Sequence, residues 1–126
     1  MSAVLTEVVI ESTDPLRAAT FWSEALGWEL REHMPGNVPW ISASGNPEEL
    51  DLKLVFVAPR DKSHLRNRLY VNPSGCDLHE EVVRLCELGA QFSDKLLDGT
   101  TETASPWVTL VDPGGTSLTV LPARVD

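Results

Sequence analysis

This sequence has few cysteines, few basic residues and no long apolar run. Cys76 and Cys86, its two cysteines, flank or lie on one expected helix and are too far apart to pair, which is typical of reduced thiols in a cytoplasmic protein. No apolar stretch approaches the roughly 18 residues of a membrane span. The N-terminus lacks a basic region followed by an apolar one, so we expect neither a membrane segment nor a signal peptide.

The shortage of basic residues also limits the choice of partners. Ten Lys and Arg stand against 19 Asp and Glu, which gives a net charge of −9 in 126 residues. This charge opposes contact with phosphate backbones, so we expect no nucleic-acid partner. The length predicts one domain with a substantial core.

Two helix signatures occur 63 residues apart. The first helix has Asp14 as its N-cap and ends at Gly27. The second begins after Asp77, forms a capping box with Glu80 and ends at Gly89. The spacing indicates that the sequence contains two copies of one supersecondary unit.

The strands repeat with the helices. The stretch "PWISASGNPEELDLKL" after the first helix is similar to "PWVTLVDPGGTSLTV" after the second. One expected strand also precedes each helix. Each half therefore predicts a strand, a helix and three more strands, with module one at about 3–58, a linker at 59–66 and module two at about 67–122. Within the single domain 1–126 we expect an α+β fold of two tandem βαβββ modules whose mixed sheets form a cup.

Several segments resemble the vicinal oxygen chelate superfamily, which includes glyoxalases, bleomycin-resistance proteins and extradiol dioxygenases. The similarity covers nearly the whole chain and is carried by "TDPLRAATFWSEALGW", "RNRLYV", "VVRLCELGA" and "WVTLVDPGGTSLTVLP". Within this superfamily, the sequence resembles the short glyoxalase-like branch. The resemblance implies paired βαβββ modules with a ligand cup between them.

Four positions of the cup decide whether the resemblance extends to a metal site. Metal-dependent members place His or Gln, Glu, His and Glu there, and this sequence has Glu7, Asp51, Tyr70 and Ser117. "LYVN" replaces the related "LHLD", and "GTSL" replaces "GNEF". Neutral Tyr and Ser are poor donors to Zn or Fe, so we predict that the metal site is lost and that no cofactor is bound.

Strand alternation places a set of side chains toward the cup. As catalytic candidates we name Glu7, Asp51 and Tyr70. As ligand-binding candidates we name Trp40, Lys53, Arg68, Trp107 and Ser117. Each has a structural alternative: the carboxylates pair with Lys53 or Arg68, Tyr70 covers the core, the tryptophans are core residues, and Ser117 is simply small.

Four functions remain open on the sequence. The preferred one is a metal-free binder of a small planar or aromatic molecule, like the bleomycin-resistance proteins, with carboxylates and tryptophans suited to a flat cation. The main alternative is a metal-independent lyase, isomerase or cyclase in which Glu7 or Asp51 acts as general base. A metal-dependent glyoxalase or dioxygenase and a structural dimerisation domain are the others. We expect a homodimer; the cup forms either within one chain or across the dimer.

Overall fold

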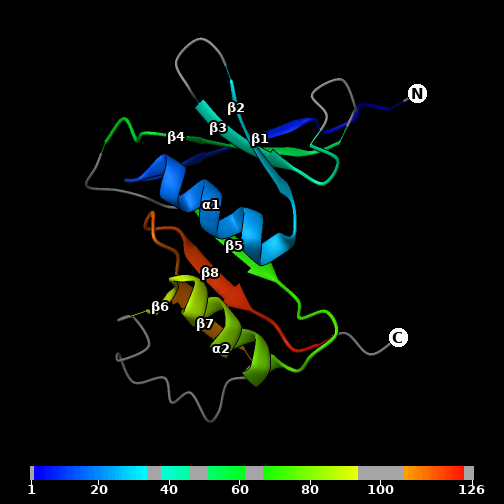
Figure 1. Ribbon diagram of the computed structural model, residues 1–126, viewed down its shortest axis with the longest axis vertical. Helices are drawn as coiled ribbons and strands as arrows, with labels where there is room; N and C mark the ends of the chain where they lie inside the picture. The colour runs from blue at the N-terminus through cyan, green and yellow to red at the C-terminus, as the bar shows by residue number, and fades with distance from the viewer. Residues whose placement is uncertain (1, 34–37, 46–50, 62–66, 94–106, 124–126) are drawn as a thin grey trace. The chain divides into compact units, whose positions relative to one another are not determined.

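The computed structural model describes residues 2–33, 38–45, 51–61, 67–93 and 107–123. The chain forms two compact units, Met1–Leu65 and Arg66–Asp126. Each unit packs one helix on a four-stranded mixed sheet (Figure 1), which confirms the expected α+β class and the two tandem βαβββ modules. Residues 62–66 of the expected linker and residues 94–97, at the end of the expected strand after the second helix, lie outside the described part of the chain.

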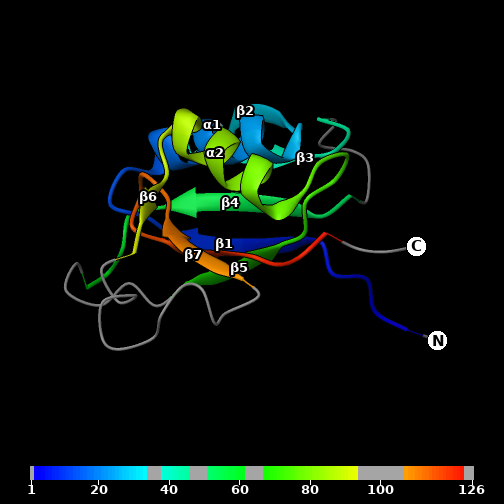
Figure 2. The ribbon, with the colours of Figure 1, turned by 90° about the horizontal axis from the view of Figure 1, so that it is seen from below.

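The two units share one topology. Unit 1 consists of β1 (Glu7–Glu11), α1 (Pro15–Leu26), β2 (Glu29–His33), β3 (Val38–Ser42) and β4 (Lys53–Val57). Unit 2 consists of β5 (Arg68–Val71), α2 (Leu78–Leu88), β6 (Gln91–Phe92), β7 (Val108–Val111) and β8 (Ser117–Val120). The strand orders are β1-β4-β3-β2 and β5-β8-β7-β6, with the first pair parallel and the others antiparallel in each sheet. Figure 2 shows β1 running beside β4.

The helix boundaries agree with the capping signals in the sequence. The Asp14 carboxylate accepts a hydrogen bond from the Arg17 backbone N–H at 3.2 Å, and α1 ends at Gly27 with φ of 72°. The Asp77 carboxylate accepts from the Glu80 N–H at 2.8 Å, and the Glu80 carboxylate accepts from the Asp77 N–H at 3.2 Å. These bonds satisfy N–H groups that have no partner within the helix, and the glycine tolerates a left-handed φ. Neither described helix is long and apolar enough to cross a membrane.

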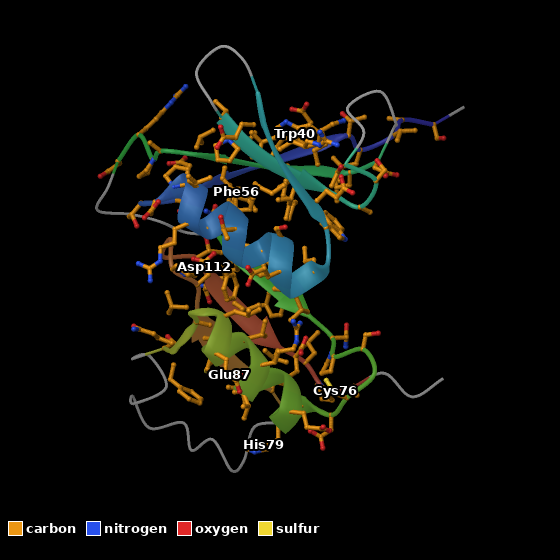
Figure 3. The ribbon with its side chains drawn as sticks, viewed as in Figure 1. Trp40, Phe56, Cys76, His79, Glu87 and Asp112 are labelled. Carbon is orange, nitrogen blue, oxygen red and sulfur yellow. The ribbon has the colours of Figure 1, made fainter. Side chains whose placement is uncertain are left out.

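The core of unit 1 lies between α1 and one face of its sheet. The rings of Phe21 and Trp22 meet edge to face, with centroids 5.4 Å apart, and both side chains are buried. Ile10, Ile41 and Phe56 are buried on the sheet. Figure 3 shows Phe56 on the side of the sheet that α1 covers and Trp40 on the opposite side. In unit 1 one face of the sheet therefore packs on α1, and Trp40 lies on the other. In each unit, the face of the sheet that its helix does not cover is here called the helix-free face.

The described part of unit 2 has a buried core of its own and a tightly bonded turn. Leu85 of α2 is buried, as are Leu118 and Val120 of β8. Between β7 and β8, one carboxylate oxygen of Asp112 accepts hydrogen bonds from the Gly114 N–H at 2.8 Å and the Thr116 N–H at 2.9 Å. Asp112 is itself buried. This turn fixes how the two central strands of unit 2 are joined.

Candidate functional site

Each helix-free face is organised in rows that run across the strands. In unit 1, Glu7 lies opposite Lys53 and Lys53 lies opposite Ser42. In unit 2, Tyr70 lies opposite Thr119, and Thr119 lies opposite Thr109. The two rows keep the sequence offsets of 63 between Glu7 and Tyr70 and 66 between Lys53 and Thr119. The register of both sheets is thus compatible with the internal repeat found in the sequence.

The centre of the unit 1 face is a buried lysine on a tryptophan. Lys53 retains 8% of its accessible surface and Trp40 retains 2%. The Lys53 ammonium nitrogen lies 5.5 Å from the centroid of the Trp40 ring. Trp40 is opposite Val55, two residues beyond Lys53, so the contact runs diagonally between β3 and β4. A cation–π contact of this kind stabilises by about 0.5–2 kcal/mol, depending on how far the cation is removed from water.

The carboxylates of unit 1 are not joined to that lysine. Glu7 is exposed and begins β1, and Asp51 is partly buried and precedes β4. In the described residues no ion pair links Lys53 to Glu7 or to Asp51, and the Lys53 ammonium group lies over Trp40. The pairing of these two carboxylates with Lys53, which the sequence offered as an alternative, is therefore absent from the described part of unit 1.

The unit 2 face carries exposed aromatic side chains. Tyr70 of β5 retains 59% of its accessible surface, and Trp107, directly before β7, retains 48%. The alternation of β7, carried back one residue, places Trp107 on the same side as Thr109. Arg68 is exposed and shares the Tyr70 side of β5. Exposed Trp and Tyr present a large apolar surface with a polar group, which suits recognition.

Hydroxyl groups occupy the middle of the same face. The Thr109 and Thr119 hydroxyl oxygens are 3.1 Å apart and share a hydrogen bond. Ser117 lies two residues before Thr119 and is half-buried. We did not select the threonine pair as site residues from the sequence. The "DPGGT" turn between two alternating strands is the signal that could have shown them to be neighbours across a hairpin.

The two tryptophans have different environments although the sequence treats them as equivalent. Trp40 lies within β3 and is buried, while Trp107 precedes β7 and is half exposed. The local motif is the same, Pro-Trp at the start of a strand, and the burial differs. The Trp40 ring is therefore almost fully covered by the protein, whereas about half of the Trp107 surface is open to solvent.

The four positions mapped to a metal site carry two carboxylates, one phenol and one hydroxyl. Glu7 and Asp51 belong to unit 1, and Tyr70 and Ser117 to unit 2. Among the described residues no three His, Cys, Asp or Glu side chains lie together in a way that could hold a metal ion. The donor set does not fit a site for zinc or iron, which needs imidazole and carboxylate groups that converge on one point.

A separate polar cluster stabilises the start of α2. The Arg84 guanidinium donates to both carboxylate oxygens of Glu81, at 2.7 and 3.1 Å, and this bond raises the pKa of Arg84. The Cys76 thiol donates to Glu81 at 3.8 Å.

The pKa values of the two thiols are raised. Desolvation, and then the negative charge of Glu81, raise the pKa of Cys76, and desolvation raises the pKa of Cys86. Both thiols are free and are disfavoured as thiolates, so neither is suited to nucleophilic chemistry.

The chain belongs to the glyoxalase-like domain family, whose model matches residues 7–121. This match confirms the resemblance to the vicinal oxygen chelate superfamily. Comparison with curated proteins finds no match.

Solved structures share the fold along almost the whole chain. Oxidase ChaP-H2 is 16% identical over 99% of this chain and 96% of its own, with a TM-score of 0.63. TnmS3, an antibiotic-binding protein from Streptomyces sp. CB03234, is 22% identical over 98% of both chains, with a TM-score of 0.57. A member of the glyoxalase/bleomycin resistance protein/dioxygenase superfamily from Sphaerobacter thermophilus DSM 20745 is 15% identical over 98% of this chain and 99% of its own, with a TM-score of 0.61. At these identities the similarity establishes a shared fold, and function has to be argued from the site.

Proposed function

We propose that this protein binds a small planar organic molecule without a transition metal, as a sequestering protein of the glyoxalase-like family. The observation that carries the proposal is the pair of exposed aromatic side chains, Tyr70 and Trp107, on the helix-free face of unit 2. They border the hydroxyl pair of Thr109 and Thr119, which supplies polar contacts that orient a ligand. A flat ring that stacks on Trp107 would gain about 0.5–1.5 kcal/mol beyond its buried area.

Two further facts support binding over metal-dependent chemistry. One structural relative is an antibiotic-binding protein. At the positions that the resemblance assigns to metal ligands, Tyr70 and Ser117 carry a phenol and an aliphatic hydroxyl in place of the imidazole and carboxylate groups that zinc and iron sites use.

A fluorescence screen with matched variants tests the proposal. The probes are planar polycyclic compounds of anionic, neutral and cationic charge, titrated with and without added Zn²⁺, Fe²⁺ and Mn²⁺. We expect a binder whose affinity does not depend on the metals. Trp107→Ala should lower the affinity for that probe about thirty-fold, equivalent to about 2 kcal/mol, because the stacking surface is removed.

The controls separate stacking from other effects. Trp107→Phe and Tyr70→Phe keep an aromatic ring and should retain most of the affinity. Unchanged affinity in Trp107→Ala would contradict the assignment of this face. Affinity that appears only with added metal would contradict metal-free binding, and consumption of the bound compound would favour the alternative, a metal-independent lyase, isomerase or cyclase.

We also propose that the protein is a homodimer. Within its sheet β1 borders β4 alone, and β5 likewise borders β8 alone. Val9 on β1 and Val4 and Leu5 before it retain 58%, 63% and 68% of their accessible surface. Edge strands with exposed apolar side chains tend to be covered by another chain. Light scattering at micromolar concentration should give twice the mass of the chain, and the mass of a single chain would count against the dimer.

A further inference from the structure

Arg68 is a charged group on the helix-free face of unit 2 that the proposed function leaves unused. It begins β5 and is exposed, and its side chain lies on the same side of the strand as Tyr70. Ser117 of β8 lies directly opposite in the parallel ladder. Because β5 borders β8 alone, Arg68 stands at the rim of the sheet, beside the side chains that the proposed function assigns to the ligand.

The described strand residues of this face include no carboxylate. Besides Arg68, the side chains that alternate onto the face from β5, β7 and β8 are Tyr70, Thr109, Val111, Ser117 and Thr119. Gln91 of β6, opposite Val111, is also uncharged. The expectation of a cationic ligand depended on Glu7 and Asp51, which both belong to unit 1. Although the whole chain has a net charge of −9, the described part of this face is therefore positively charged.

The Arg68 guanidinium suits an anionic group of a ligand. It forms no ion pair within the described part of the chain. Its N–H donors form a planar fork that matches the two oxygens of a carboxylate. The Ser117 hydroxyl, across the ladder, can donate to the same anion. A cationic ligand would instead meet a like charge at this rim.

The strand register determines where on the ligand that anionic group lies. Tyr70 and Thr109 share one row across the sheet, through Thr119. Arg68 comes two residues before Tyr70, and Trp107 comes two residues before Thr109 on a strand that runs the opposite way. With strands about 4.8 Å apart and a rise of about 3.3 Å per residue, the Cα atoms of Arg68 and Trp107 are roughly 16 Å apart. A molecule that contacts both side chains is therefore elongated, with a ring at one end and the anion at the other.

We propose that Arg68 recognises a carboxylate at one end of an elongated planar ligand whose rings stack on Trp107. This inference rests on the proposed function, because it assumes that a planar ligand binds on the helix-free face of unit 2. It goes further in naming the charge and shape of the ligand and the residue that selects them. Arg68 then acts as a specificity determinant, and every residue of the site belongs to unit 2.

Three probes with one ring system test the preference for charge and for its position. They are anthracene-2-carboxylate, with the anion at the end of the long axis, anthracene-9-carboxylate, with the anion at its middle, and the neutral anthracene-2-carboxamide. Fluorescence anisotropy of each probe is followed at pH 7 as protein is added. Wild-type protein should bind the 2-carboxylate about five- to tenfold more tightly than the amide, a modest factor because Arg68 is exposed. Equal affinities for these two probes would overturn the inference.

Substitutions at Arg68 locate the preference. Arg68→Gln removes the charge from an exposed position, and it should lower the affinity for the 2-carboxylate about five- to tenfold while changing the other two probes less than about twofold. Arg68→Lys keeps the charge without the fork and should lie between wild type and Arg68→Gln. Arg17→Gln is the matched control: it removes one positive charge from an exposed position on α1 of unit 1 and should leave all three affinities unchanged. A preference for the 2-carboxylate that persists in Arg68→Gln, or that is lost equally in Arg17→Gln, would overturn the inference.

The experiment also separates this inference from the proposed function. If the three probes bind equally and all lose affinity in Trp107→Ala, the planar-ligand site stands and the role of Arg68 is wrong. If Arg68→Gln lowers the affinity for both carboxylates equally, the position assigned to the anion at the end of the ligand is wrong. If no probe binds at millimolar protein concentration, the proposed function and this inference are both wrong.

Discussion

Replacing Trp40 by alanine should lower the free energy of unfolding by about 3–5 kcal/mol, as expected when a large buried aromatic side chain is removed. Trp40 retains 2% of its accessible surface, and its loss would leave a cavity below the Lys53 ammonium group. The loss of the cation–π contact adds to the loss of packing. Urea unfolding followed by circular dichroism measures the change.

Trp107→Ala is the matched control for this measurement. Trp107 retains 48% of its accessible surface, so its removal should cost no more than about 1 kcal/mol. The two variants delete the same side chain from the same Pro-Trp motif, and they should therefore separate folding from binding. If Trp40→Ala unfolds within about 1 kcal/mol of wild type and loses ligand affinity, Trp40 is a ligand wall and not a core residue.

Asp112→Ala should destabilise the protein by about 2–4 kcal/mol, because two buried N–H groups would lose their acceptor. The Asp112 oxygen accepts from Gly114 at 2.8 Å and from Thr116 at 2.9 Å, and the three residues are all buried. Each orphaned donor costs roughly 1–3 kcal/mol. The turn also joins β7 to β8, so a weaker turn should loosen the hydroxyl pair that these strands carry.

Asp112→Asn provides the matched comparison, since the amide oxygen can still accept both hydrogen bonds. Chemical denaturation should show that the asparagine variant loses less than half as much free energy of unfolding as the alanine variant does. Equal destabilisation by the two substitutions would mean that the negative charge stabilises the turn and that the shared acceptor oxygen does not. An alanine variant as stable as wild type would contradict the account of the turn altogether.

The elements that the sequence predicted correctly are those set by local chemistry. Asp14 and Asp77 cap helices because a short carboxylate side chain reaches the N–H groups of the next turn. The strand alternation on which the sequence analysis relied is seen in β1, where Ile10 is buried and Val9 is exposed. The repeat itself follows from these signals, since two similar local patterns fold into two similar units.

The elements that the sequence could not predict depend on neighbours far away in the chain. The sequence names Lys53 as a ligand-binding candidate with carboxylates as alternative partners, and the side chain lies on Trp40, a contact that exists only once β3 and β4 are in register. In the same way, the Thr109–Thr119 pair requires the β7–β8 register. Alternation gives the face of a strand on which a residue lies, but it does not give the row or the partner.

The sequence by itself determined the βαβββ repeat and the helix ends, and its match to the glyoxalase-like domain model shows the family. Each of these follows from residue type, spacing or periodicity, which act over a few neighbouring positions. Only the tertiary structure decided that Trp40 is buried beneath a lysine while Trp107 is half exposed. Burial is the sum of contacts from many segments, so two identical Pro-Trp motifs reach different environments.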